Sequence, residues 1–315
     1  MSVAEPKVSS LKRPVMIAAA VVLLAGIAVH LALQFDDVRQ LSRLSVVVLA
    51  GSVALLFGSQ LAHNESLLVP LRTHLPRLGF WELFFVRTGG LVVGSAVPVA
   101  GGVAVRLAYL KRQGLTYADF AHATLLSNVL ALVAAACLAL PATALLWAVA
   151  GAPPIAALGL DVAVLALGAG ALAVLHALPR LARHPRISQW IPAVSESASR
   201  PIMLRVFWAS MFRHVSNFIA FGWLYSALSD VPGGFLAGGL VYALTSPLRM
   251  VNVTPGNVGV NEWAVAIVGQ ALAFDLTTGL LVGGVFLVAS LAAQALGVLV
   301  GWALSGSSPL SEPRP

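Results

Sequence analysis

The sequence predicts an all-α polytopic membrane protein, and three observations lead to this fold class. Of the 315 residues, 59% are hydrophobic and only 10% are charged, whereas a soluble domain carries about 25% charged residues. The mean hydropathy is +0.90. Long apolar runs alternate with short loops that hold most of the basic residues. So few charges cannot cover a globular surface of this size in water, and the surplus apolar surface must therefore face lipid.

Six apolar runs are long enough to form full transmembrane helices, because about 20 apolar residues cross the hydrocarbon core. They cover residues 15–33, 46–61, 120–149, 155–178, 206–228 and 276–304. We therefore predict one transmembrane domain over residues 15–304, with short tails at 1–14 and 305–315. The first run could instead be a signal peptide, but it is longer than a typical signal core and no small-residue cleavage site follows it.

Two further apolar stretches, residues 83–98 and 235–253, are interrupted by proline and glycine. Proline removes a backbone donor and glycine weakens a helix interior, so each stretch should break. Irregular backbone at membrane depth is tolerated only where it is buried in protein or lines a cavity. We therefore predict two re-entrant hairpins. The residues at the breaks are Pro98, Gly101 and Gly102 in the first, and Pro255, Gly256 and Gly259 in the second.

The basic residues indicate the topology, because cytoplasmic loops carry an excess of lysine and arginine. With the N-terminus inside and both broken stretches re-entrant, the basic loop residues outside are Arg39 and Arg43, offset by two aspartates. If residues 83–98 crossed fully, the five arginines of segment 180–205 would move outside. The positive-inside rule disfavours this alternative. We predict a bacterial-type inner-membrane protein with both termini in the cytoplasm.

The predicted elements repeat in the same order, with opposite orientation, in halves of about 15–150 and 155–304. Each half contains two spans, a hairpin and a span. The motif Pro98-x3-Gly102-x3-Arg106 is echoed by Pro255-x3-Gly259-x2-Glu262. In transporters built as inverted repeats, the broken helices mark the substrate site at the midplane. We therefore expect the substrate between the two hairpins.

The second hairpin contains the most informative polar residue, Glu262, with Asn257 and Asn261 nearby. A carboxylate at membrane depth is costly unless it is paired, protonated or functional. Glu262 could therefore contact substrate or pair with an arginine, and the alternative is a structural glutamate that accepts from loose backbone amides. Arg106 holds the matching place in the first hairpin. It could bind a phosphate through both arms of its guanidinium, or it could be an anchor at the interface.

Arg213 and Asn217 lie four residues apart in the fifth span and should share one helix face. A polar face within a span is expected to point into the bundle, where it could contact substrate or pair with Glu262. Weaker candidates of the same kind are Arg87, Asn128, Arg249 and Asn252. Three polar residues near the end of the second span are predicted to mark the membrane interface, namely Gln60, His63 and Asn64.

Several chemistries have no signature in this sequence. It has no Walker A motif, no His-Glu-x-x-His and no Gly-x-Ser-x-Gly. The one cysteine, Cys137, lies in an apolar run and is predicted to be a buried, inert thiol. We therefore expect no metal, no cofactor and no catalytic group. The formal net charge of +7 does not indicate nucleic-acid binding, because the basic residues lie in the loops between spans.

The hairpin motifs resemble those of the lysylphosphatidylglycerol synthase transmembrane-region family, which contains flippase-like membrane proteins. Residues 255–262, Pro-Gly-Asn-Val-Gly-Val-Asn-Glu, are similar to the family pattern Pro-Gly-Gly-Leu-Gly-Val-x-Glu. Pro98, Gly102 and Arg106 match the pattern Pro-x3-Gly-Glu-x2-Arg, with Val103 in place of its glutamate. The polar group that usually follows in the next span is replaced here by Ser127, Asn128 and Ala131.

The resemblance implies a membrane domain that translocates or handles a phospholipid or glycolipid, with membrane lipids as its partners. The family's aminoacyl-transferase domain is not present in this sequence, so lysyl transfer by this chain is not expected. One alternative is a membrane-embedded transferase acting on a lipid-linked substrate, although only Glu262 is placed for such chemistry. Another is a non-catalytic partner of a lipid-modifying enzyme, with segment 180–205 as its docking surface.

Overall fold

The protein is helical throughout the part of the chain that its structure, a computed structural model, describes. This part is residues 21–305 without 23, 31, 33–38, 97–100, 151–154, 182–198, 251–256, 258 and 273. Within it every regular element is a helix, which confirms the predicted all-α class. The elements with defined bounds are η1 (Arg39–Arg43), α3 (Val46–Leu71), α4 (Phe80–Ala96), α5 (Gly101–Arg112), α6 (Tyr117–Ala150), α7 (Ile155–Leu181), α10 (Arg200–Leu228), α11 (Gly234–Thr245), η2 (Leu248–Met250), α12 (Val260–Ala271) and α13 (Leu276–Leu304).

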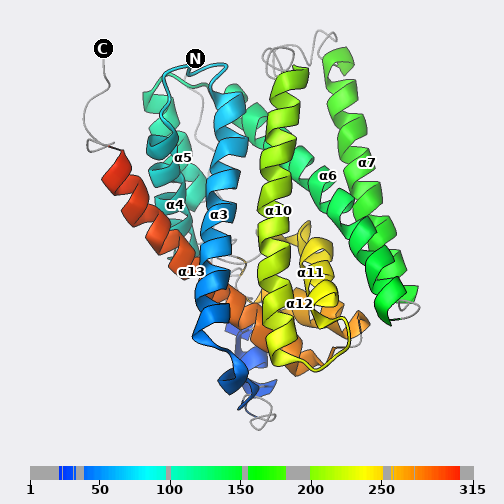
Figure 1. The fold of residues 1–315 in the computed structure, drawn as a ribbon. Helices are drawn as coiled ribbons and strands as arrows, with labels where there is room; N and C mark the ends of the chain where they lie inside the picture. Colours follow the sequence, from blue (N-terminus) through cyan, green and yellow to red (C-terminus); the bar gives the residue numbers. More distant parts are fainter. Residues whose placement is uncertain are drawn as a thin grey trace.

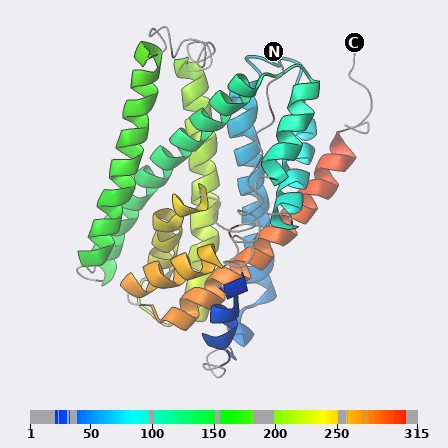
Figure 2. The ribbon, with the colours of Figure 1, turned by 180° about the vertical axis from the view of Figure 1, so that it is seen from behind.

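Two long helices, α3 and α10, pack against each other in the centre of the bundle (Figure 1). Helices α6 and α7 lie together on one side, and α13 crosses the bundle obliquely, as the reverse view also shows (Figure 2). The short helices form two pairs, α4 with α5 and α11 with α12. In Figure 1 the first pair occupies the upper half of the bundle and the second pair the lower half.

Local sequence signals explain where several helices begin. Ser45 caps α3 by accepting from the Val48 amide at 3.2 Å, and Asp275 caps α13 by accepting from the Thr278 amide at 2.7 Å. Small polar side chains are favoured at this position because they satisfy a free helix amide. Helix α12 follows Gly259, whose φ of 82° lies in the region that favours glycine.

The outer surface is apolar, and the interior combines a hydrophobic core with a smaller set of buried polar residues. Trp208 and Trp302 are exposed on α10 and α13, whereas Ser59, Asn64 and Ser127 are buried. Three of the described helices are long and apolar enough to cross a bilayer: Val46–Leu71, Tyr117–Val149 and Leu276–Leu304. The chain is therefore a membrane protein, because such surfaces are stable only in contact with lipid.

The helices follow most of the predicted spans closely. Helix α13 has the predicted bounds, and α6 and α7 differ from theirs by a few residues. Helix α3 continues to Leu71 rather than ending at residue 61, because the polar residues after Leu61 face the interior and do not terminate the helix. Helices α7 and α10 have 27 and 29 residues, which is long enough to cross. A total of six full spans stays a prediction.

Both interrupted stretches are broken, as predicted from their proline and glycine residues. Helices α4 and α5 are separate elements, and so are α11 and α12. Gly101 and Gly102 are the first residues of α5, and Gly259 precedes α12. Three predicted break residues lie outside the described residues: Pro98, Pro255 and Gly256.

Glycines allow the backbones of α4 and α5 to touch. A Cβ atom added at Gly90 would lie 2.8 Å from the Gly102 carbonyl oxygen, closer than real Cβ contacts come. The reciprocal substitution at Gly102 would meet the Gly90 carbonyl oxygen even more closely. Gly102 therefore serves the close approach of two helices.

The prediction for Cys137 was wrong in one respect. Its side chain is exposed on α6 and is not buried in the protein. On a helix that is long and apolar enough to cross the membrane, an exposed thiol faces lipid. An apolar run alone does not distinguish a core position from a lipid-facing one, because both environments favour the same residues.

Candidate functional site

A buried arginine joins α3 to α4. The Arg87 side chain is 0% exposed. One terminal guanidinium nitrogen lies 3.0 Å from the Nδ1 atom of His63, and the other donates to the backbone and side-chain oxygens of Gln60 at 2.7 and 2.6 Å. The prediction that Gln60 and His63 mark the membrane interface was therefore wrong. They support an interior cation, because a buried charge is stable only when it is hydrogen-bonded.

Arg106 lies beside Arg87 because of the packing of α4 and α5. These helices run in opposite directions and touch at Gly90 and Gly102. Arg87 lies three residues before Gly90 and Arg106 four residues after Gly102, so both lie about one turn, about 4.5–6 Å, toward the same end. Arg106 is partly buried and within electrostatic range of Arg87. Among the described residues its side chain donates one hydrogen bond, at 3.4 Å, to the Gly102 carbonyl in its own helix.

Helix α10 brings a third arginine to the same region. The Asn217 side chain donates to the Ser59 hydroxyl on α3 and to the Arg213 carbonyl, both at 2.7 Å. Asn217 thus holds α10 against α3, next to the residues that bind Arg87. The Arg213 side chain is within electrostatic range of Arg87 and His63. It makes no hydrogen bond or ion pair with the residues that the structure describes.

A fourth arginine, Arg249, extends from η2 onto a group of aromatic rings. Its guanidinium carbon lies 5.1, 5.4 and 5.0 Å from the ring centres of Phe221, Tyr242 and Phe286. The Tyr242 hydroxyl is 3.1 Å from the Nδ1 atom of His214, the neighbour of Arg213. Cation–π contacts in a dry interior position a guanidinium without neutralising it. Arg249 is within electrostatic range of both Arg213 and Glu262.

Glu262 has a structural task in this arrangement. Its side chain is buried, and its Oε2 atom accepts from the Gly259 amide at 2.6 Å, which caps the start of α12. Arg249 is within electrostatic range of it. Asn257 is buried with a left-handed φ of 55°, and Asn261 is only partly buried. These three residues shape the turn into α12.

The four arginines form what we call the arginine array, Arg87, Arg106, Arg213 and Arg249. They come from the first helix pair, α4 and α5, from the central helix α10, and from η2 in the connection between α11 and α12. The arginine–carboxylate ion pairs found among the described residues lie elsewhere, between Arg43 and Asp230 and between Arg205 and Glu65. Unpaired guanidinium groups in an interior of low polarity bind anions strongly, above all carboxylates and phosphates.

Arg87 and Arg249, which the sequence indicates only as weaker candidates, carry a signal in that each is a charge within a predicted hairpin. Such charges are rare in membrane segments and mark functional sites by default. The array was not visible in sequence because its members are far apart along the chain and meet only through helix packing.

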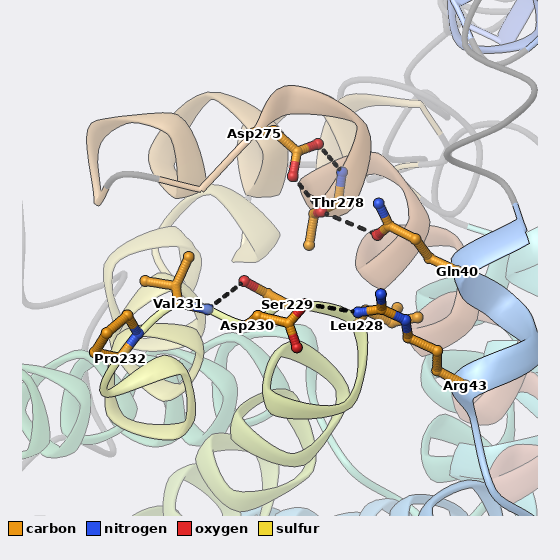
Figure 3. Close-up of a pocket in the computed structure, with 9 residues that line it drawn as sticks. All are labelled: Gln40, Arg43, Leu228, Ser229, Asp230, Val231, Pro232, Asp275 and Thr278. Carbon is orange, nitrogen blue, oxygen red and sulfur yellow. Dashed lines mark hydrogen bonds and ion pairs between the residues drawn. The ribbon is translucent and has the colours of Figure 1, made fainter.

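A separate pocket of about 440 Å³ lies at the C-terminal end of α10 (Figure 3). Its polar side chains are bonded to one another: Arg43 pairs with Asp230 at 2.9 Å, and Asp275 accepts from the amide and hydroxyl of Thr278. The remaining lining residues are Gln40, Leu228, Ser229, Val231 and Pro232. Because its charges are already paired, this pocket has less capacity for an anion than the arginine array.

Replacing Glu262 by glutamine should preserve folding, because an amide oxygen can still accept from the Gly259 amide. Replacing it by alanine should lower stability by about 1 kcal/mol, the usual cost of a lost helix cap. Thermal melting of the two purified variants in detergent checks this order. A melting temperature that falls equally in both variants would contradict the capping role and would indicate that the negative charge itself stabilises the fold.

Comparison with known proteins gives one positive result. Residues 15–301 match the model of the family described as "Lysylphosphatidylglycerol synthase TM region". No curated protein and no solved structure was found to match the chain. The matched region contains both helix pairs and all four members of the arginine array. The chain therefore belongs to the lysylphosphatidylglycerol synthase transmembrane-region family.

Proposed function

We propose that this protein is a flippase-like membrane protein that binds a lipid headgroup at the arginine array and moves it between leaflets of the inner membrane. The array is the observation that carries the proposal. Three of its guanidinium groups have no acidic partner within ion-pair distance among the described residues, and a fourth is held by neutral groups. Lipid phosphates are the abundant anions of a membrane, and arginine binds them through paired hydrogen bonds.

An inverted repeat, with α4–α5 and α11–α12 as re-entrant hairpins, is part of this proposal. Its two halves would cover about 15–150 and 155–304. The helix contacts support it, because they are exchanged between the halves. Helix α4 packs on α13 while α11 packs on α6, and α3 packs on α13 while α10 packs on α6. Alternating access in such folds is a rocking of one repeat against the other around a central site.

We also propose that the upper end of the bundle in Figure 1 faces the cytoplasm. The connections α3–α4 and α5–α6 lie at this end, together with the start of α10 and the end of α13. Basic residues concentrate in these segments, as the positive-inside rule requires. They are Arg72, Arg77, Lys111, Arg112 and Arg200.

Single-cysteine labelling tests this orientation. In a Cys137→Ala background, cysteines at Lys111, Arg112 and Arg183 should resist a membrane-impermeant maleimide in intact cells and react after lysis. A cysteine at Arg43 should react in intact cells, because Arg43 directly precedes α3, whose first residues lie at the opposite end of the bundle, and its side chain is about half exposed. Labelling of the Arg183 variant from outside would contradict the inverted repeat. Arg183 lies outside the described residues, so this arm is independent of the structure.

In the proposed mechanism the protein moves lipid without making or breaking a covalent bond. The headgroup would pass between the two helix pairs while the acyl chains stay in lipid along the apolar outer surface. The exposed side chains of α10 and α13 offer such a surface. A separate lipid-modifying enzyme is a candidate partner, because a headgroup that is modified in one leaflet needs transport to reach the other.

Reconstitution into liposomes tests the function directly. Vesicles with the full chain should accelerate the loss of a fluorescent phospholipid from the outer leaflet, followed by dithionite quenching, relative to protein-free vesicles. Dithionite must stay excluded, which a soluble fluorophore trapped inside the vesicles verifies. Unchanged exchange for anionic, zwitterionic and cationic phospholipids would refute the flippase proposal.

A further inference from the structure

We infer that the arginine array selects a lipid phosphate with at least two negative charges, a phosphomonoester or a diphosphate, over a phosphodiester headgroup. The inference rests on the proposed function, because it names the class of lipid that the same site would take. It follows from three features: the balance of charge at the site, the donors that the guanidinium groups leave free, and the apolar surface around the bundle.

The charge balance favours a dianion. Four guanidinium groups are always protonated in proteins. Glu262, the carboxylate within range of the array among the described residues, is near Arg249 and already accepts from the Gly259 amide. A site with four positive charges and one negative charge remains positive after it binds a phosphodiester, which carries a single charge. A phosphomonoester carries a charge of about −1.5 to −2 at pH 7 and therefore neutralises more of the excess positive charge at the array.

The free donors favour three terminal oxygens. Arg87 directs its terminal nitrogens to His63 and Gln60, and it therefore serves as a support. Arg106 makes one long bond within its own helix, and Arg213 and Arg249 donate to no described acceptor. These three arginines are partly exposed and come from α5, α10 and η2. A phosphomonoester has three terminal oxygens, one for each of them, whereas a phosphodiester has two.

The surroundings indicate that the phosphate belongs to a lipid. The helices that present the array, α4, α5 and α10, expose apolar side chains on their outer faces, among them Val93, Val105 and Phe212. A headgroup at the array can therefore keep its acyl chains in the bilayer. Free phosphate or pyrophosphate offers the same oxygens without this apolar contact. It should bind more weakly at equal concentration, because the burial of chains is lost.

Binding to the full-length protein in detergent micelles tests the inference. The probes are phosphatidic acid, diacylglycerol diphosphate, phosphatidylglycerol and phosphatidylcholine with the same acyl chains, together with inorganic phosphate and pyrophosphate. We expect phosphatidic acid and the diphosphate to bind at least about tenfold more tightly than phosphatidylglycerol, the usual effect of one added charge-assisted hydrogen bond. In Arg213→Gln this ratio should fall toward one, and in Arg205→Gln it should be unchanged, because Arg205 pairs with Glu65 at the surface.

The outcomes separate the inference from the function. Equal binding of phosphatidic acid and phosphatidylglycerol overturns the selection while leaving lipid transport intact. Binding of no lipid at all overturns both. Inorganic phosphate or pyrophosphate that binds as tightly as phosphatidic acid overturns the assignment to a lipid. If Arg213→Gln does not yield folded protein, Arg106→Gln provides the same test, and a ratio that survives in a folded array variant also overturns the inference.

Discussion

Replacing Arg213 by glutamine should slow phospholipid exchange between leaflets by about tenfold to a hundredfold. This is the expected loss when one charged hydrogen bond to a phosphate is removed, because such a bond contributes about 1.5–3 kcal/mol. The effect should be large because Arg213 lies on the central helix α10, within electrostatic range of both Arg87 and Arg249. The measurement is dithionite quenching of a labelled phospholipid in proteoliposomes with equal amounts of reconstituted protein.

Arg205→Gln is the matched control, because it removes the same charge from the same helix. Its partner Glu65 lies at the surface, and an exposed pair of this kind contributes little. Exchange by this variant should stay near that of the unaltered protein. Arg213→Lys adds a second comparison, since lysine keeps the charge but loses the paired donors. Exchange by Arg213→Gln equal to that of Arg205→Gln would remove Arg213 from the lipid path.

Alanine at Gly90 should destabilise the protein by about 1–3 kcal/mol, the usual cost of overpacking a tight contact. The new Cβ would lie 2.8 Å from the Gly102 carbonyl oxygen, a backbone atom that cannot move aside as a side chain can. Helices α4 and α5 would have to separate, and Arg87 and Arg106 would move apart with them. Lipid exchange should therefore fall together with the melting temperature. The reciprocal change Gly102→Ala should cost more, because its Cβ would come closer still.

The neighbouring glycine provides the control. A Cβ added at Gly89 meets no atom within 4 Å, and alanine there gains the same helix propensity, about 1 kcal/mol. Gly89→Ala should therefore be neutral or stabilising. The difference between the two variants isolates the contact between the helices from the change in propensity. Equal melting temperatures for Gly89→Ala and Gly90→Ala would show that α4 and α5 do not depend on their close approach.

Helix bounds were predictable where hydropathy changes sharply. The predicted and observed bounds of α13 agree, because Asp275 and Ser305 flank a long, mostly apolar run without charged residues. Helix α3 was predicted too short because Gln60, His63 and Asn64 interrupt its apolar pattern. In the structure these side chains face the interior, where Asn64 donates to the Phe80 carbonyl at 3.0 Å. A polar residue that is satisfied by a neighbouring helix does not end a span, but its own sequence cannot show this.

The candidate site was predictable only in part. The two breaks and Arg106, Arg213 and Glu262 were identified because charges and prolines are rare in apolar runs. The relative importance of these residues was not predictable. Glu262 is the most informative polar residue in the sequence, yet its carboxylate caps a helix. Arg249 is a weaker candidate in the sequence, yet its guanidinium lies near three aromatic rings from α10, α11 and α13.

The sequence by itself determined the all-α membrane class and the breaks in two helices. These properties depend on local composition, because a helix that crosses lipid must be apolar and charged residues are favoured in the loops outside the hydrocarbon core. Only the tertiary structure decided that Arg87, Arg106, Arg213 and Arg249 form one array. Their proximity depends on helix contacts such as Gly90 with Gly102 and Ser59 with Asn217, between residues distant along the chain. Packing of this kind is a property of complementary shapes and has no signature in any single stretch of sequence.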